Sequence, residues 1–159
     1  MSTFTRTLFF LFSLFFFNSC SPASNQKENK VSLHKYGFPV SIKVPKDVAF
    51  TKGSSSFVES LTLVNNDGFN MQVLMTNASS GSLKKAKLLQ REIVINNPDF
   101  LKIIEDYDDH FIFELELNGD RYYDFRFVKI VGNKEIVFQG GPTCNCTEEN
   151  IKKMVNAVQ

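Results

Sequence analysis

The stretch FIFELELNGDRYYDFRFVKIVGNKEIVF, residues 111–138, decides the fold class of this chain. From Phe111 to Leu117, apolar and acidic side chains alternate, with Glu114 and Glu116 expected to face outward, which is the pattern of a β-strand with one buried face. Polar turns at Asn118-Gly119 and Gly132-Asn133 separate two further runs rich in aromatic and β-branched residues. The stretch therefore predicts an antiparallel meander with strands at 111–117, 121–131 and 135–138.

One more strand is expected before this meander. Residues 100–105 contain the β-branched pair Ile103-Ile104 and precede a polar turn at 107–110. Residues 98–105 could instead form a short helix with Pro98 at its first position. We favour the strand because the spacing of the meander is then regular.

The rest of the chain supplies three strands and two helices. Alternating apolar residues predict strands at 40–44, 61–63 and 69–76, and the sequence Asn65-Asn66-Asp67-Gly68 predicts a hairpin between the last two. Ser82 can cap a helix over 83–95, with Leu83, Ala86, Leu89 or Gln90, and Ile93 on its buried stripe. Thr147 can cap a final helix with Ile151, Met154, Val155 and Val158 inside. These elements predict a single α+β domain over 31–159, in the order β-β-β-α-β-β-β-β-α, with an antiparallel sheet of six to seven strands.

The first residues have the pattern of an export signal. Arg6 precedes an apolar run from Leu8 to Phe17 that only Ser13 interrupts. A positive segment followed by a short apolar segment is typical of a signal peptide, which we place at 1–19. An uncleaved membrane anchor is the alternative, but the run is shorter than the roughly 20 apolar residues that a spanning helix needs.

The end of this segment, Phe17-Asn18-Ser19-Cys20, resembles the lipobox of bacterial lipoproteins, in the looser form known from the Bacteroidetes. The resemblance implies that Cys20 carries lipid, with acyl chains such as palmitate, and becomes the first mature residue. Residues 21–30 contain one apolar side chain, so residues 20–30 are expected to be a flexible tether reaching about 35 Å. By analogy with lipoprotein sorting, Ser21 favours the periplasmic side of the outer membrane.

The domain itself resembles the PsbP/Mog1-like fold. The resemblance rests on the element order, on Tyr36-Gly37-Phe38 before a strand that ends at Pro45, and on Phe138 followed by a small-residue loop and a helix. Members of this fold include extrinsic photosystem II subunits, a Ran-binding protein and uncharacterised bacterial envelope proteins. The resemblance implies a binding or accessory role and gives no catalytic residues to transfer.

Charge and motifs exclude several function classes. The chain has 18 Lys+Arg against 17 Asp+Glu, a balance that argues against a nucleic-acid binder, which must neutralise phosphates. It also argues against a polybasic membrane-surface module. No nucleotide-binding, hydrolase or zinc-protease motif occurs, so we expect no cofactor and favour a non-enzymatic role.

Cys144 and Cys146 are the main candidates for chemistry. In an exported protein, two thiols this close are expected to be oxidised or metal-bound. A disulfide or two unreactive thiols is the preferred interpretation. A soft-metal site completed by a methionine, and redox exchange with Cys146 as a thiolate near a helix N-terminus, are the alternatives.

Other polar residues give weaker signals. The acidic run from Glu105 to His110 is expected to be a solvated turn, because it lacks the spacing of a calcium loop. His34 and His110 are expected at the surface, while Met71 and Met75 are expected in the core. Tyr122 beside Arg126 is a possible protein-binding patch.

Together these features predict an envelope lipoprotein that is anchored through Cys20 and binds a protein partner or assists a membrane assembly. The alternative is a metal-binding or thiol-redox lipoprotein that uses Cys144 and Cys146.

Overall fold

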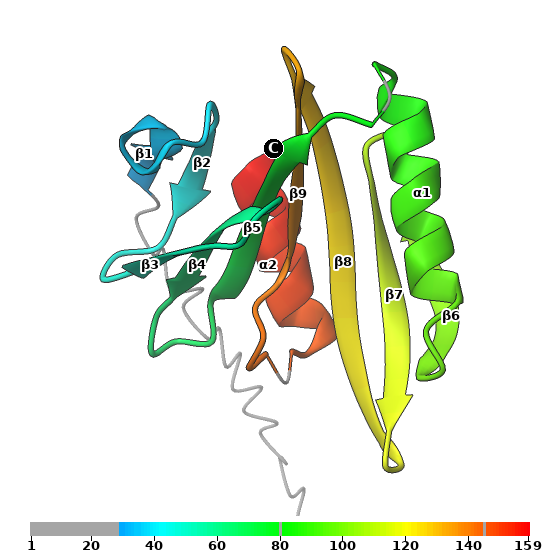
Figure 1. Ribbon diagram of the computed structural model, residues 1–159. Coiled ribbons are helices and arrows are strands. Elements are labelled where there is room, and N and C mark those ends of the chain that lie inside the picture. Colours follow the sequence, from blue (N-terminus) through cyan, green and yellow to red (C-terminus); the bar gives the residue numbers. More distant parts are fainter. Residues whose placement is uncertain (1–28, 80, 145) are drawn as a thin grey trace, which may run out of the picture.

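The computed structural model describes residues 29–79, 81–144 and 146–159, which form an α+β domain (Figure 1). The predicted signal peptide at 1–19 and the predicted lipidation site, Cys20, lie outside these residues. Asn29 and Lys30, the last two residues of the predicted tether, belong to the first strand. The domain therefore includes at least these two residues of the predicted tether.

Seven strands form one antiparallel sheet in the order β3-β4-β5-β9-β8-β7-β6. In chain order its elements are β3 (Ala49–Ser54), β4 (Glu59–Val64), β5 (Asn70–Asn77), α1 (Leu83–Ile95), β6 (Phe100–Asp106), β7 (His110–Leu117), β8 (Asp120–Val131), β9 (Lys134–Gly140) and α2 (Glu148–Val158). Helix α1 carries the chain from β5 to the far edge of the sheet. The meander then returns inward until β9 pairs with β5.

A second, two-stranded sheet lies beside the first. It pairs β1 (Asn29–Ser32) with β2 (Ser41–Val44), and the 3-10 helix η1 (Leu33–Tyr36) connects them. Gly37 ends η1 with a φ of 94°, in the left-handed region that favours glycine. The buried side chains of this unit, Leu33, Phe38 and Ile42, pack into the core of the main sheet.

The predicted fold class is confirmed, since the domain is α+β with a seven-stranded antiparallel sheet and two helices. The alternative helix at 98–105 is wrong, because Phe100–Asp106 pairs with β7 as a strand. Two strands were not predicted, β1 and β3. The predicted strand at 40–44 exists as β2, but it pairs with β1 and not with the main sheet.

The larger core lies between the sheet and α2. Helix α2 packs against β8 and β2 (Figure 1). Its buried residues are those expected, namely Ile151, Met154, Val155 and Val158, together with Ala157. Met71 and Met75 are buried in the same core, which confirms their structural role.

Helix α1 packs against β8 and β6, and its Val94 forms a second, smaller core together with Phe111 and Phe113 of β7. Strand β7 is buried on both sides, because Ile112 belongs to the α2 core while its neighbours belong to the α1 core. The expectation that Glu114 faces solvent is therefore wrong. Its side chain is 3 % exposed and forms ion pairs with Lys102 at 3.1 Å and Arg121 at 3.3 Å.

Candidate functional site

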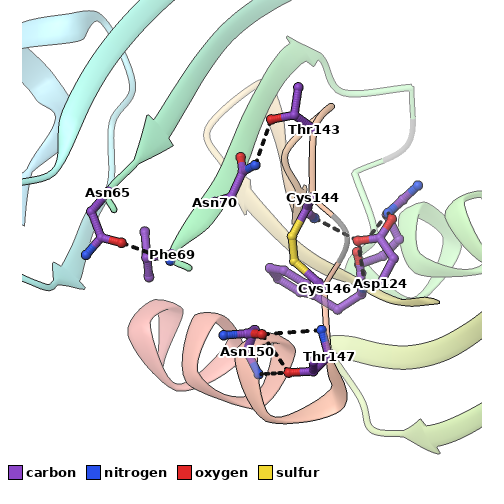
Figure 2. The surroundings of a disulfide bond; sticks show 12 residues. Asn65, Phe69, Asn70, Asp124, Thr143, Cys144, Cys146, Thr147 and Asn150 are labelled. Carbon is purple, nitrogen blue, oxygen red and sulfur yellow. Dashed lines mark hydrogen bonds and ion pairs between the residues drawn. A yellow bond between two sulfur atoms is a disulfide. The ribbon is translucent and has the colours of Figure 1, made fainter. Parts of the chain in front are cut away.

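Cys144 and Cys146 form a disulfide in the loop between β9 and α2 (Figure 2). Their Cα atoms are 5.0 Å apart, within the usual range for a disulfide. Cys146 is buried in the α2 core with 4 % exposure, whereas Cys144 is half-buried at its edge. An external reagent therefore has better access to Cys144 than to Cys146.

Hydrogen bonds hold this loop independently of the disulfide. The Gly141 N–H donates to the Asn70 carbonyl at 2.9 Å, and the Cys144 N–H donates to the Gly141 carbonyl at 2.9 Å. The Asn70 side-chain amide donates to the Thr143 hydroxyl at 3.0 Å. The Tyr123 N–H donates to the Cys146 carbonyl at 3.1 Å. The backbone that carries both sulfur atoms is thus fixed on each side of the disulfide.

The disulfide loop lies beside the point where β8 and β9 separate. Their pairing ends at Phe127 and Phe138, although β9 continues to Gly140 beside β5. In place of the missing ladder bonds, one carboxylate oxygen of Asp124 accepts the Gly140 and Phe125 N–H groups, both at 2.7 Å. The sequence gives no signal for this role, because an Asp in a strand is usually exposed.

The predicted patch of Tyr122 and Arg126 lies on the same strand as Asp124. Arg126 donates to the second Asp124 oxygen at 2.7 Å and to the Phe125 carbonyl at 2.8 Å. Its guanidinium also lies 5.3 Å from the centre of the Phe113 ring. Arg126 is therefore occupied by contacts within the sheet, while Tyr122 is half-buried. Both side chains are half-buried, so the two residues do not form an exposed patch.

Helix α1 presents large apolar side chains to solvent. Of its expected stripe Ala86 is buried, while Leu83, Leu89 and Ile93 are exposed and Val94 is buried in their place. Gln90, the alternative to Leu89 in that stripe, faces the sheet, where it donates to the buried carboxylate of Glu135 at 3.1 Å. Exposed Leu and Ile side chains therefore lie along the outside of α1.

A groove of about 580 Å³ lies between α1 and the turn that joins β6 to β7, and we call it the α1 groove. It is lined by Leu83, Lys84, Lys87, Leu88, Arg91, Asp106 and Asp108. Asp106 forms ion pairs with Lys87 and Arg91. The groove therefore combines apolar side chains with charges of both signs.

The turn from β6 to β7 also lines a smaller groove of about 340 Å³ against α2. Here the expectation for His110 is wrong, because it is buried between Tyr107 and Phe127, with ring centres 4.5 and 5.1 Å away. Its Nδ1 lies 2.6 Å from an Asp109 carboxylate oxygen. His34 is exposed, as expected.

Ion pairs across this smaller groove shift two pKa values. A hydrogen bond from Lys152 lowers the pKa of Glu105, which lies 3.0 Å away. Hydrogen bonds to Glu148 and Glu105 raise the pKa of Lys152. The Lys152–Glu105 pair ties the end of β6 to α2, because Glu105 belongs to this strand and not to the predicted turn.

The described residues contain no group of three His, Cys, Asp or Glu side chains arranged to hold a metal ion. No helix in the same part of the chain is long and apolar enough to cross a membrane. Comparison with protein-family models, with curated proteins and with solved structures finds no match for this chain.

Proposed function

We propose that this chain is a lipoprotein of the bacterial cell envelope, anchored through Cys20 on the periplasmic side of the outer membrane. Its domain would bind a protein partner or assist a membrane assembly. The disulfide supports export, because disulfides persist in oxidising compartments and are rare in the cytosol. The element order supports a likeness to the PsbP/Mog1-like fold, whose members are mostly accessory proteins.

The observation that carries the binding role is the outer surface of α1. Leu88 and Ile93 are 52 % and 62 % exposed, and Leu89 is exposed between them. A surface helix normally turns such residues toward the core. Neighbouring exposed apolar side chains on a helix are typical of an interaction site.

Two measurements test this proposal. The intact mass of the protein from its native membrane should correspond to a chain that begins at Cys20 and carries lipid. A photo-crosslinker at Leu88, installed in the full chain in its native membrane, should give one discrete protein adduct. The matched control is a crosslinker at Lys153, which is exposed on α2. An unlipidated soluble form, or equal crosslinking from both positions, would contradict the proposal.

The disulfide favours thiol exchange as a second candidate function. A thiolate of a substrate dithiol would attack the accessible Cys144 sulfur, so that the bond to Cys146 breaks and Cys146 leaves as a thiolate. The second substrate thiolate would then release Cys144, which leaves the substrate oxidised and the Cys144–Cys146 pair reduced. The loop hydrogen bonds support this role, since they would keep both sulfurs close after reduction.

Alkylation with mass analysis tests the exchange. In the wild type, dithiothreitol should open the Cys144–Cys146 disulfide while the domain stays folded. With glutathione disulfide, Cys146→Ser should form a mixed disulfide at Cys144 and release one glutathione thiolate, while Cys144→Ser should react slowly because Cys146 is buried. Equal reaction rates of the two variants would exclude the exchange. A wild-type disulfide that opens only when the domain unfolds would also exclude it.

A further inference from the structure

We propose that the α1 groove receives an acidic segment with apolar side chains from a protein partner. The inference rests on the proposed binding role and names the chemistry of the partner. It is carried by the arrangement of charge on α1, which differs from that on α2 in a way that folding alone does not require.

The first turn of α1 carries the wrong charge for a helix. Lys84 and Lys85 follow Leu83 directly, and the turn contains no acidic residue. Cations at this end oppose the helix dipole and destabilise the helix. Helix α2 follows the favourable rule, with Glu148 and Glu149 in its first turn. Lys84 and Lys85 are therefore a cost to the folded state.

Lys84 and Lys85 form no ion pair in the described part of the domain, whereas Lys87 and Arg91, one and two turns further on, are both paired with Asp106. Asp108 lines the same groove as Lys84 but forms no ion pair with it, so the cations of the groove outnumber its carboxylates by three to two. An anionic group placed at the start of α1 would meet two unpaired ammonium groups and the positive end of the helix dipole. Charge complementarity thus requires an acidic partner.

Apolar contacts define the rest of the surface. Leu83 and Leu88 line the groove and are 37 % and 52 % exposed. The groove lies between a helix and a turn, and is concave, so side chains of a folded or helical segment can enter it. A flat bilayer surface would leave it unfilled. A protein segment with acidic and apolar residues therefore fits better than a membrane.

Two synthetic peptides test the charge requirement. Both are amphipathic helices of about 15 residues with leucines on one face. One carries glutamates beside the leucines and the other carries lysines. Titration against the full mature protein in detergent should show binding of the glutamate peptide, with the lysine peptide about tenfold weaker. Equal binding of the two peptides, or no binding of either, would overturn the inference.

Charge reversal in the protein provides the second arm. Lys84→Glu with Lys85→Glu should reverse the peptide preference while raising Tm, because anions in the first turn favour the helix. The control is Lys43→Glu with Lys46→Glu, which makes the same charge change at exposed residues on and after β2. The control should change the ratio of the two peptide affinities by no more than about twofold.

The outcomes separate this inference from the proposed function. If the crosslinker at Leu88 captures a protein but the charge reversal changes neither capture nor peptide preference, the acidic partner is wrong and the binding role stands. If the crosslinker labels phospholipid in vesicles containing phosphatidylglycerol and labels no protein in the native membrane, the surface is a membrane contact and both fail.

Discussion

Replacing Asp124 with alanine should destabilise the domain more than the loss of an ordinary surface charge. The side chain is 20 % exposed, and one of its oxygens accepts two backbone N–H groups where β8 and β9 separate. Alanine would leave the Phe125 and Gly140 N–H groups without this acceptor. Each unsatisfied buried donor costs about 1–3 kcal/mol, and partial water access favours the lower end of that range, about 1–1.5 kcal/mol for each of the two donors. We therefore expect a loss of about 2–3 kcal/mol in the free energy of unfolding.

Thermal and urea unfolding, followed by circular dichroism, measure this effect. With an unfolding entropy of about 2.1 cal/mol/K per residue over roughly 130 residues, the loss corresponds to a Tm lower by about 7–11 °C. Asp124→Asn keeps an oxygen that can accept both N–H groups, but its NH2 group cannot accept from Arg126, so it should lose the ion pair and hydrogen bond with Arg126 and cost about 1 kcal/mol.

The control for this prediction is Asp108→Ala, which removes an exposed carboxylate from the turn between β6 and β7. It should change stability by no more than about 0.5 kcal/mol. If Asp124→Ala were as mild as this control, the two N–H groups would have to find other acceptors. The carboxylate would then not be what closes the gap between the strands.

Two further predictions concern the end of β6 and the disulfide loop. The lowered pKa of Glu105 means that its bond to Lys152 stabilises the fold above pH 4.5, the group's ordinary pKa, and that this contribution is lost as the pH falls through the lower folded value. The stability difference between wild type and Glu105→Gln should therefore be positive but below about 1 kcal/mol at pH 7, and should shrink as the pH falls below 4.5; a difference that grows in acid would refute it. Gly141→Ala would place a Cβ 1.8 Å from the Asn70 side-chain oxygen and should cost more than about 3 kcal/mol in urea unfolding, whereas Gly81→Ala meets no atom within 4 Å and should be neutral. Similar urea midpoints for the two glycine variants would show that the loop shifts without cost.

The elements that could be predicted are those with a local signal. Helix α1 has the predicted bounds, 83–95, because Ser82 precedes it and Asn96-Asn97-Pro98 follows it. The start of α2 was equally clear, since Thr147 caps the Asn150 N–H and Asn150 bonds back to the Thr147 backbone. The meander was found because each turn is polar, the strand from Phe111 alternates in sequence, and the other runs are rich in aromatic and β-branched residues.

The features that were missed depend on contacts between distant residues. Strand β3, with the sequence AFTKGS, has little apolar alternation and exists because it pairs with β4 along its full length. Which of Leu89 and Gln90 faces the sheet depends on the buried Glu135, which accepts a hydrogen bond from Gln90. Asp124 can accept the Phe125 and Gly140 N–H groups because β8 and β9 separate beside it. None of these contacts leaves a pattern within a short window of sequence.

The two helices show how folding and binding can use different sides of one element. Helix α2 has an acidic first turn, a capping box and an apolar face that is fully buried. Helix α1 begins and ends as predicted, but its first turn is basic. Its outer side carries exposed leucines. The core formed by Val94 and Phe113, and the hydrogen bond from Gln90 to Glu135, hold α1 on the sheet. Because these sheet-facing contacts hold α1 on the sheet, its outer side can vary without loss of the fold, and the exposed apolar residues there are the basis of the binding role proposed above.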